Sequence, residues 1–237
     1  MIIKLAGHGL AFFCNLLLAD TMKIALPLLL ALFGATFAAH AQDVKGDAAR
    51  GAKLNASCIG CHGIPGYQAS FPEVYRVPAI SGQNAKYIVA ALDAYRKGER
   101  KHGTMRAVAG TLSDQDIADL AAYYSAHGGD AQSSAAAPAP SADVTALLTK
   151  GACASCHGAD FRKPIDGAYP KIAGQYPDYL FTALKSYKIE NNPQVGRGNA
   201  IMSAQVKQFS NKELKALAQY LGSLPADVHT IAQSKLR

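Results

Sequence analysis

Two stretches of five residues in this chain carry the residue types and spacing of a redox cofactor site. They are Cys58-Ile59-Gly60-Cys61-His62 and Cys153-Ala154-Ser155-Cys156-His157. In a C-x-x-C-H stretch on a helical turn, the two thiols can add to the two vinyl groups of one haem while the adjacent imidazole reaches the iron. Two copies therefore predict two covalently bound haem c groups, attached through the four cysteines.

Paired cysteines have two other common uses. A C-x-x-C pair can form a disulfide or a thioredoxin-like redox dithiol, but that motif occurs in a βαβ pattern, whereas the surroundings here are typical of helices. A zinc site needs four ligands spread around a tetrahedral ion, and a His next to a Cys cannot easily turn to share that ion with both thiols. We therefore expect His62 and His157 each to occupy one axial position of a haem iron.

Two methionines have the spacing expected of the second axial ligands. Beyond residue 41 the chain contains only Met105 and Met202, which lie 47 and 49 residues after Cys58 and Cys153. We expect each in a Gly-flanked loop before the last helix of its half. A thioether ligand favours reduced iron, and a six-coordinate iron leaves no site for oxygen or peroxide. Met105 and Met202 therefore indicate an electron carrier, unless both serve only as core filler.

His102 competes with Met105 as a ligand, because it lies three residues away and imidazole binds haem iron readily. Its counterpart in the second half is Asn199. A ligand that the repeat does not keep is the weaker candidate.

Further residues near the two motifs could support the cofactors. A carbonyl of Pro78 or Pro170 could accept the hydrogen bond from the other ring nitrogen of the axial histidine and so increase its donor strength. Four side chains could contact haem propionates, although core packing or solvation would also explain them: Tyr95, Tyr187, Arg106 and Arg197.

The chain repeats itself. Pro78-Ala79-Ile80-Ser81-Gly82-Gln83 matches Pro170-Lys171-Ile172-Ala173-Gly174-Gln175 at an offset of 92 residues, and the offset becomes 97 where Met105 matches Met202. This pattern indicates one ancestral domain that was duplicated.

The same order of elements is expected in each half: a helix with the C-x-x-C-H motif, an irregular loop, a middle helix, a Gly-rich loop and a closing helix. Ser113-x-x-Asp116 and Ser210-x-x-Glu213 predict the starts of the closing helices. The middle helices should begin at Asn84 and near Pro177, and Gly98 and Asn192-Pro193 lie where they should stop. Strand signals are nearly absent, so the fold class is all-α.

The first residues resemble an export signal. Met22 and Lys23 precede the apolar run Ile24 to Phe37, and Ala39-His40-Ala41 supplies small residues for a signal peptidase. We expect residues 1–41 to be a signal peptide cleaved before Gln42, with Met22 as the true start. An uncleaved anchor is the alternative, but Ile24 to Ala39 spans sixteen residues and includes Pro27, whereas a spanning helix needs about twenty.

Composition then sets the domain boundaries. Residues 129–140 are rich in Gly, Ser, Ala and Pro and have no apolar periodicity, which predicts a linker. The first domain would be 42–128 and the second 141–237. With 49% hydrophobic and 17% charged residues the chain is an ordinary globular protein, and a net charge of +7 without any basic run does not indicate a nucleic-acid partner.

With two C-x-x-C-H motifs, two spaced methionines and a P-x-I-x-G-Q segment in each half, the sequence resembles the cytochrome c4 family from about Asp43 to Leu224. The resemblance implies two tandem class I cytochrome c domains with haems close to their interface. It also assigns the ligands: Cys58, Cys61, His62 and Met105 for the first haem, and Cys153, Cys156, His157 and Met202 for the second. The chain lacks tryptophan, so a tryptophan contact to a propionate must be replaced by another group.

The resemblance further implies an electron carrier rather than an enzyme. It would take single electrons from a redox-protein donor in respiration and deliver them to a membrane haem-copper terminal oxidase. We expect a periplasmic monomer, with peripheral membrane association left open. Two alternatives are a di-haem oxidoreductase, such as a peroxidase or a thiosulfate dehydrogenase, and a cytochrome subunit of a larger respiratory complex.

Overall fold

A computed structural model describes residues 44–128 and 136–232 of the chain. The expected signal peptide, its cleavage before Gln42 and the start at Met22 lie outside these residues. Within the described part, no helix has the length and apolar character needed to cross a membrane.

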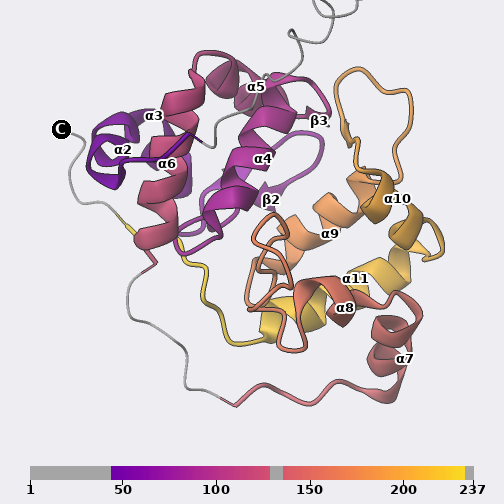
Figure 1. Cartoon of the computed structure of the whole chain (residues 1–237). Helices are drawn as coiled ribbons and strands as arrows, with labels where there is room; N and C mark the ends of the chain where they lie inside the picture. Colours follow the sequence, from indigo (N-terminus) through magenta and orange to yellow (C-terminus); the bar gives the residue numbers. More distant parts are fainter. Residues whose placement is uncertain (1–43, 129–135, 233–237) are drawn as a thin grey trace, which may run out of the picture. The chain divides into compact units, whose positions relative to one another are not determined.

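The first half consists of short helices with three two-residue strands, drawn in indigo to magenta in Figure 1. In chain order its elements are α2 (Ala48–Leu54), α3 (Ala56–His62), β1 (Gln68–Ala69), β2 (Tyr75–Arg76), α4 (Ala85–Arg96), β3 (Arg100–Lys101), α5 (Gly103–Gly110) and α6 (Asp114–Ala126). Helices α2 and α4 both pack on α6.

Within its described residues, the second half repeats this order without counterparts of β1 and β2, and is drawn from salmon red through orange to yellow in Figure 1. Its elements are α7 (Ala142–Lys150), α8 (Cys153–His157), α9 (Pro177–Ser186), β4 (Gly196–Arg197), α10 (Ala200–Lys207) and α11 (Asn211–Ser223). Helix α9 packs on α11 as α4 packs on α6. The predicted all-α fold with an internal duplication is confirmed, and the small strands were the part that the sequence did not predict.

Both closing helices begin with the predicted capping boxes. Ser113 Oγ accepts from the backbone N–H of Asp116 at 3.1 Å, and the Asp116 carboxylate accepts from the N–H of Ser113 at 3.0 Å. Ser210 and Glu213 make the same reciprocal pair. A cap of this kind stabilises a helix by about 1 kcal/mol. Each closing helix buries one apolar stripe: Ile117, Leu120, Ala121 and Tyr124 on α6, and Leu214, Leu217, Ala218 and Leu221 on α11.

Two expectations about loops were wrong. Met105 and Met202 lie in the first turns of helices α5 and α10, not in Gly-flanked loops. Each helix can start there because the side chain of the preceding cap, His102 or Asn199, accepts the backbone N–H of the methionine at 3.3 and 2.9 Å.

The second middle helix also ends earlier than predicted. Helix α9 stops at Ser186, before Asn192-Pro193. The Tyr187 carbonyl accepts a hydrogen bond from Ser203 Oγ of α10 at 2.9 Å, so this carbonyl does not need another helical turn. Asn191, just beyond, has a left-handed backbone with φ of 56°.

The first half anchors its N-terminal helix through a buried carboxylate. Asp119 is completely buried on α6 and accepts from Arg50 Nη1 and from the backbone N–H of Asp47, both at 2.7 Å. Helix α2 approaches α6 so closely that a Cβ at Gly51 would lie 2.1 Å from the carbonyl oxygen of Asp119. Only glycine allows this crossing, which holds the helix ahead of the first C-x-x-C-H motif.

Three apolar clusters form the cores. One, around Ile88, Leu120 and Tyr124, packs against Cys58 in the first half. The others lie in the second half, where Cys153 packs against the cluster around Leu221 and Met202 against the cluster around Leu214. The core of each half therefore extends up to its expected haem-binding residues.

The halves contact each other through a strand pair, two ion pairs and the C-terminal segment. Strands β3 and β4 pair antiparallel, with Arg100 opposite Arg197. Arg76 binds the carboxylate of Asp178 at 3.0 Å, and Lys185 binds that of Glu73 at 2.6 Å. The segment after α11 returns to the first half, where His229 pairs with Ser81.

Candidate functional site

The two C-x-x-C-H histidines are held in matching orientations. His62 ends α3 and His157 ends α8, and their Nδ1 atoms lie 2.8 Å from the Pro78 carbonyl oxygen and 3.0 Å from the Pro170 carbonyl oxygen. A carbonyl only accepts, so each Nδ1 carries the proton and each Nε2 keeps a free lone pair. The contacts expected of Pro78 and Pro170 are present, and both imidazoles are oriented to bind a metal through Nε2.

The surroundings keep both imidazoles neutral. Burial lowers the pKa of His62 and of His157 below the ordinary value, and the hydrogen bonds to the two proline carbonyls offset this only in part. Neutral imidazole is the form that ligates iron.

The four motif cysteines are free thiols and half-buried. Burial raises the pKa of Cys58 and of Cys153, so both thiols stay protonated at neutral pH. They are paired neither with each other nor across the halves, which fits attachment to a cofactor.

The predicted ligands of both halves line one continuous cavity of about 1170 Å³. Its walls include all four motif cysteines, His62, His157, Met105 and Met202. Aliphatic and aromatic side chains from α4, α6, α9 and α11 contribute to the remaining wall, together with loop residues and several polar side chains. The structure thus brings together the four predicted attachment cysteines and the four predicted iron ligands in one large cavity.

His102 has a role that differs from the one considered for it. It is the N-cap of α5, and its Nδ1 accepts from the backbone N–H of Met105. Burial, with Arg100 and Arg197 nearby, lowers the pKa of His102, which keeps Nδ1 available as an acceptor. Asn199 performs the same capping role for Met202, so the exchange of His for Asn between the halves preserves a function.

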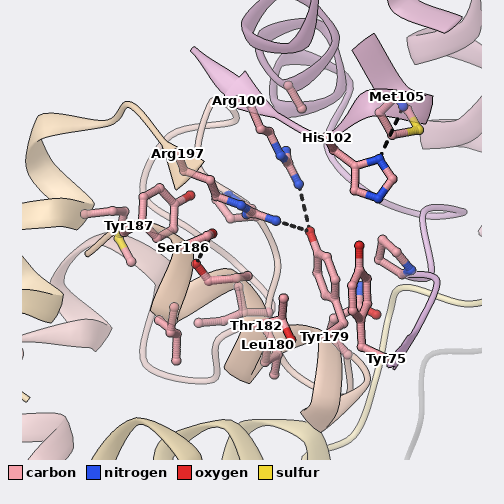
Figure 2. A pocket seen from close by; sticks show the side chains of 18 of the residues that line it. Tyr75, Arg100, His102, Met105, Tyr179, Leu180, Thr182, Ser186, Tyr187 and Arg197 are labelled. Carbon is pink, nitrogen blue, oxygen red and sulfur yellow. Dashed lines mark hydrogen bonds between the residues drawn. The ribbon is translucent and has the colours of Figure 1, made fainter. Parts of the chain in front are cut away.

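A cluster of two arginines and several tyrosines lies where the halves meet (Figure 2). We call it the arginine–tyrosine cluster, and its members are Tyr87, Tyr95, Arg100, Tyr179, Tyr187 and Arg197. Arg100 Nη2 and Arg197 Nη2 both donate to the hydroxyl of Tyr179, at 2.8 and 3.1 Å. Arg100 also lies over the ring of Tyr95, and Arg197 over that of Tyr187.

This cluster carries positive charge without a carboxylate. Among the described residues, neither Arg100 nor Arg197 has an ion pair with an acidic side chain, and Arg100 Nε is buried without a partner. Burial raises the pKa of Tyr179, but Arg197 and Arg100 outweigh it and lower that pKa to about 8. Two adjacent guanidinium groups and a buried free N–H are suited to binding anionic groups.

The sequence identified only part of this cluster. Tyr95, Tyr187 and Arg197 were named as candidate contacts and lie in the cavity wall. Arg106 is exposed and is not part of that wall. Arg100 was missed, although its alignment with Arg197 at the 97-residue offset was a signal that could have found it.

Comparison with known proteins identifies the cytochrome c family and, within it, cytochrome c4. The cytochrome c family model matches residues 48–126 and again 141–225. Cytochrome c4 of Azotobacter vinelandii is 30% identical over 220 residues, which covers 86% of this chain and 100% of that protein. A solved structure of Acidithiobacillus ferrooxidans cytochrome c4 is 30% identical, with a TM-score of 0.56, and covers 72% of this chain and 99% of that one. A thiosulfate dehydrogenase electron acceptor of Thiomonas intermedia is 27% identical and covers 76% of this chain and 84% of that protein.

Proposed function

Because this chain belongs to the cytochrome c4 family of di-haem electron-transfer proteins, we propose that it carries single electrons in the periplasm from a respiratory redox protein to a membrane terminal oxidase. It binds two covalently attached haem c groups, one in each half. The observation that carries the proposal is that His62, Met105, His157 and Met202 all line the wall of one cavity.

The residues fit this cofactor. Cys58 and Cys61 would attach the first haem and Cys153 and Cys156 the second, since all four are free thiols beside the axial histidines. The free Nε2 of His62 and of His157 would each be a ligand of one iron. Met105 and Met202 would each supply a thioether ligand. When bound, each haem supplies a reversible one-electron change at iron.

The arginine–tyrosine cluster would hold the carboxylate ends of the cofactors. The buried free Nε of Arg100 and the absence of an acidic partner for either arginine in the described residues support this role. Positive charge beside a carboxylate offsets its burial, and tyrosine hydroxyls add hydrogen bonds. The chain has no tryptophan, and this cluster would take the place of the expected tryptophan contact.

The two methionines argue against chemistry at iron. Met105 and Met202 would fill the last open position of each iron, which would leave no site for oxygen or peroxide. Electrons would enter and leave through exposed haem edges, and no substrate bond would form or break.

Ligand binding separates this carrier from a di-haem oxidoreductase. We would add carbon monoxide to the reduced haem-loaded protein and cyanide to the oxidised protein. A carrier with two closed irons gives unchanged spectra. Stoichiometric binding at one iron would instead indicate an enzyme with an open or displaceable ligand.

The electron acceptor is tested with membranes that contain a haem-copper oxidase. The reduced protein should be reoxidised by these membranes in air, and cyanide should stop the reaction because it blocks the oxidase. Reoxidation that does not depend on the membranes would refute the proposed partner.

One comparison favours a second donor. Because a relative of 27% identity is described as a thiosulfate dehydrogenase electron acceptor, we also propose that this chain accepts electrons from such an enzyme. Rapid reduction by a thiosulfate dehydrogenase with thiosulfate, and none with either alone, is the expected result. Failure of the complete mixture to reduce the protein would exclude this donor.

A further inference from the structure

The two P-x-I-x-G-Q segments, one in each half, are joined by hydrogen bonds from their glutamine side chains. The Gln175 side chain accepts the backbone N–H of Ala79 at 3.1 Å and donates to the Ala79 carbonyl at 2.9 Å. Gln83 accepts the backbone N–H of Lys171 at 2.9 Å and donates to the Lys171 carbonyl at 3.0 Å. Ala79 and Lys171 are equivalent residues, 92 apart. The two contacts are therefore symmetric: Gln175 of the second half binds Ala79 of the first, and Gln83 of the first half binds the equivalent residue, Lys171, of the second.

The orientation of both glutamine amides follows from their neighbours. Gln83 Oε1 also accepts the N–H of Asn84 at 2.9 Å, and Gln175 Oε1 that of Tyr176 at 3.0 Å. An oxygen that faces two N–H donors cannot be exchanged with the amide nitrogen. Both glutamines are 4% exposed, so these hydrogen bonds are shielded from water.

Each backbone N–H that donates to a glutamine side chain belongs to a peptide group that also orients an axial histidine. The N–H of Ala79 and the C=O of Pro78 are the two ends of one peptide unit, and that C=O accepts from His62 Nδ1 at 2.8 Å. The N–H of Lys171 and the C=O of Pro170 form the equivalent unit, which accepts from His157 Nδ1 at 3.0 Å. A continuous chain of hydrogen bonds thus runs from the glutamine of one half to the axial histidine of the other.

Such chains change the strength of their members. An acceptor at the N–H end of a peptide draws electron density toward its carbonyl oxygen, and hydrogen bonds in series strengthen one another by roughly 10–30% each. A more negative carbonyl pulls harder on the Nδ1 proton and makes the imidazole a stronger donor to iron. Stronger donation stabilises ferric iron and lowers the reduction potential.

We propose that Gln175 tunes the haem bound by His62, and that Gln83 tunes the haem bound by His157. The two glutamines are positioning residues that act through the Pro78–Ala79 and Pro170–Lys171 peptides. The potential of each haem is thereby set in part by a side chain of the opposite half. This inference rests on the proposed binding of haem at His62 and His157.

The test replaces each glutamine with methionine, which has similar length and no amide. Gln208→Met is the matched control, since Gln208 is exposed and, among the described residues, its side-chain amide binds only the Gln205 carbonyl. Two readouts are taken on haem-loaded protein: the two midpoint potentials, and the nitrogen-15 NMR signals of the histidine Nδ1–H groups in the reduced state. NMR signals from residues of each half, followed during the redox titration, assign each potential to its haem.

The expected pattern is crossed. Gln175→Met raises the potential of the haem at His62 and moves the Nδ1–H proton of His62 upfield, while His157 and its haem stay unchanged. Gln83→Met gives the mirror result, and Gln208→Met changes neither. Gln175→Glu keeps an acceptor oxygen opposite Ala79. The potential of the haem at His62 should therefore return to the wild-type value or fall below it. A loosened interface would instead shift this potential in the same direction in Gln175→Met and Gln175→Glu.

Three outcomes would overturn the inference: each variant alters the haem of its own half, both haems shift equally, or neither shifts although both remain bound. Wild-type protein that binds no haem through His62 or His157 would instead refute the proposed function, so the two failures are distinguishable.

Discussion

His102 illustrates how one residue can fit two roles in the sequence and only one of them in the structure. An imidazole three residues from Met105 suggests an iron ligand, yet its Nδ1 accepts the backbone N–H of Met105. Asn199 does the same for Met202 with a side-chain oxygen. The shared function is to start a helix whose first turn carries the methionine, which fixes the backbone position of that residue.

His102→Asn should therefore be a silent change for the cofactor. We expect the visible spectrum and both potentials to stay as in the wild type, because asparagine caps helices well. His102→Ala should lower the free energy of unfolding by about 1 kcal/mol, since it removes the cap. Denaturant unfolding and absorption spectra measure both effects. Loss of a low-spin signal in His102→Asn would mean that His102 is an iron ligand after all.

Arg100 is the residue whose charge should matter most for the cofactors. A nearby positive charge favours ferrous over ferric haem, because reduction removes one positive charge from the iron. Arg100→Gln should lower at least one midpoint potential in a redox titration. Arg106→Gln is the control, since Arg106 is exposed outside the cavity, and it should change neither potential. Equal shifts in the two variants would argue against a special role for the arginine–tyrosine cluster.

At the scale of elements, local signals predicted well and long-range contacts did not. Each capping box, at Ser113 and at Ser210, involves residues only three positions apart, so the sequence alone predicts it. The cap at His102 was missed because histidine is an uncommon N-cap, and the cap at Asn199 was missed because Met202 was expected in a loop. Gln83 and Gln175 were recognised as repeated, but their partners lie 88 and 96 residues away. No local pattern specifies such pairings.

The crossing of α2 and α6 depends on Gly51. Gly51→Ala would place a Cβ 2.1 Å from the carbonyl oxygen of Asp119, so the helices must separate. We expect a loss of about 1–3 kcal/mol in the free energy of unfolding, as for other overpacked sites. Gly110→Ala is the matched control, because a Cβ there would meet nothing within 4 Å. Urea unfolding that leaves Gly51→Ala as stable as the control would contradict this packing.

At the scale of the whole described part, two carboxylates connect the halves, and both have lowered pKa values. For Asp178, burial raises the pKa, but hydrogen bonds from Arg76 outweigh it. For Glu73, burial likewise raises the pKa, but hydrogen bonds from Lys185 and Thr182 outweigh this effect and lower the pKa. A depressed carboxyl pKa adds stability above its ordinary value, and this stability is lost as the pH falls through the lowered value.

The interface should therefore weaken below about pH 4, where these carboxylates begin to protonate. Hydrogen exchange of backbone amides at the interface, measured between neutral and acid pH, should show earlier loss of protection there than in the helix cores. A double variant, Glu73→Gln with Asp178→Asn, should already exchange faster at neutral pH and show a smaller change with acid. An unaltered acid response in the double variant would assign the effect to other groups.

The central claim is that each iron is closed by one histidine and one methionine. The most direct measurement is the absorption spectrum of the oxidised protein, with haem quantified per chain, for the wild type, Met105→Ala and Met202→Ala. We predict two haems per chain and a weak sulfur-to-iron band at the red end of the spectrum. Each variant should lose about half of that band and gain a site for carbon monoxide. A band of undiminished intensity in either variant would contradict the assignment for that half.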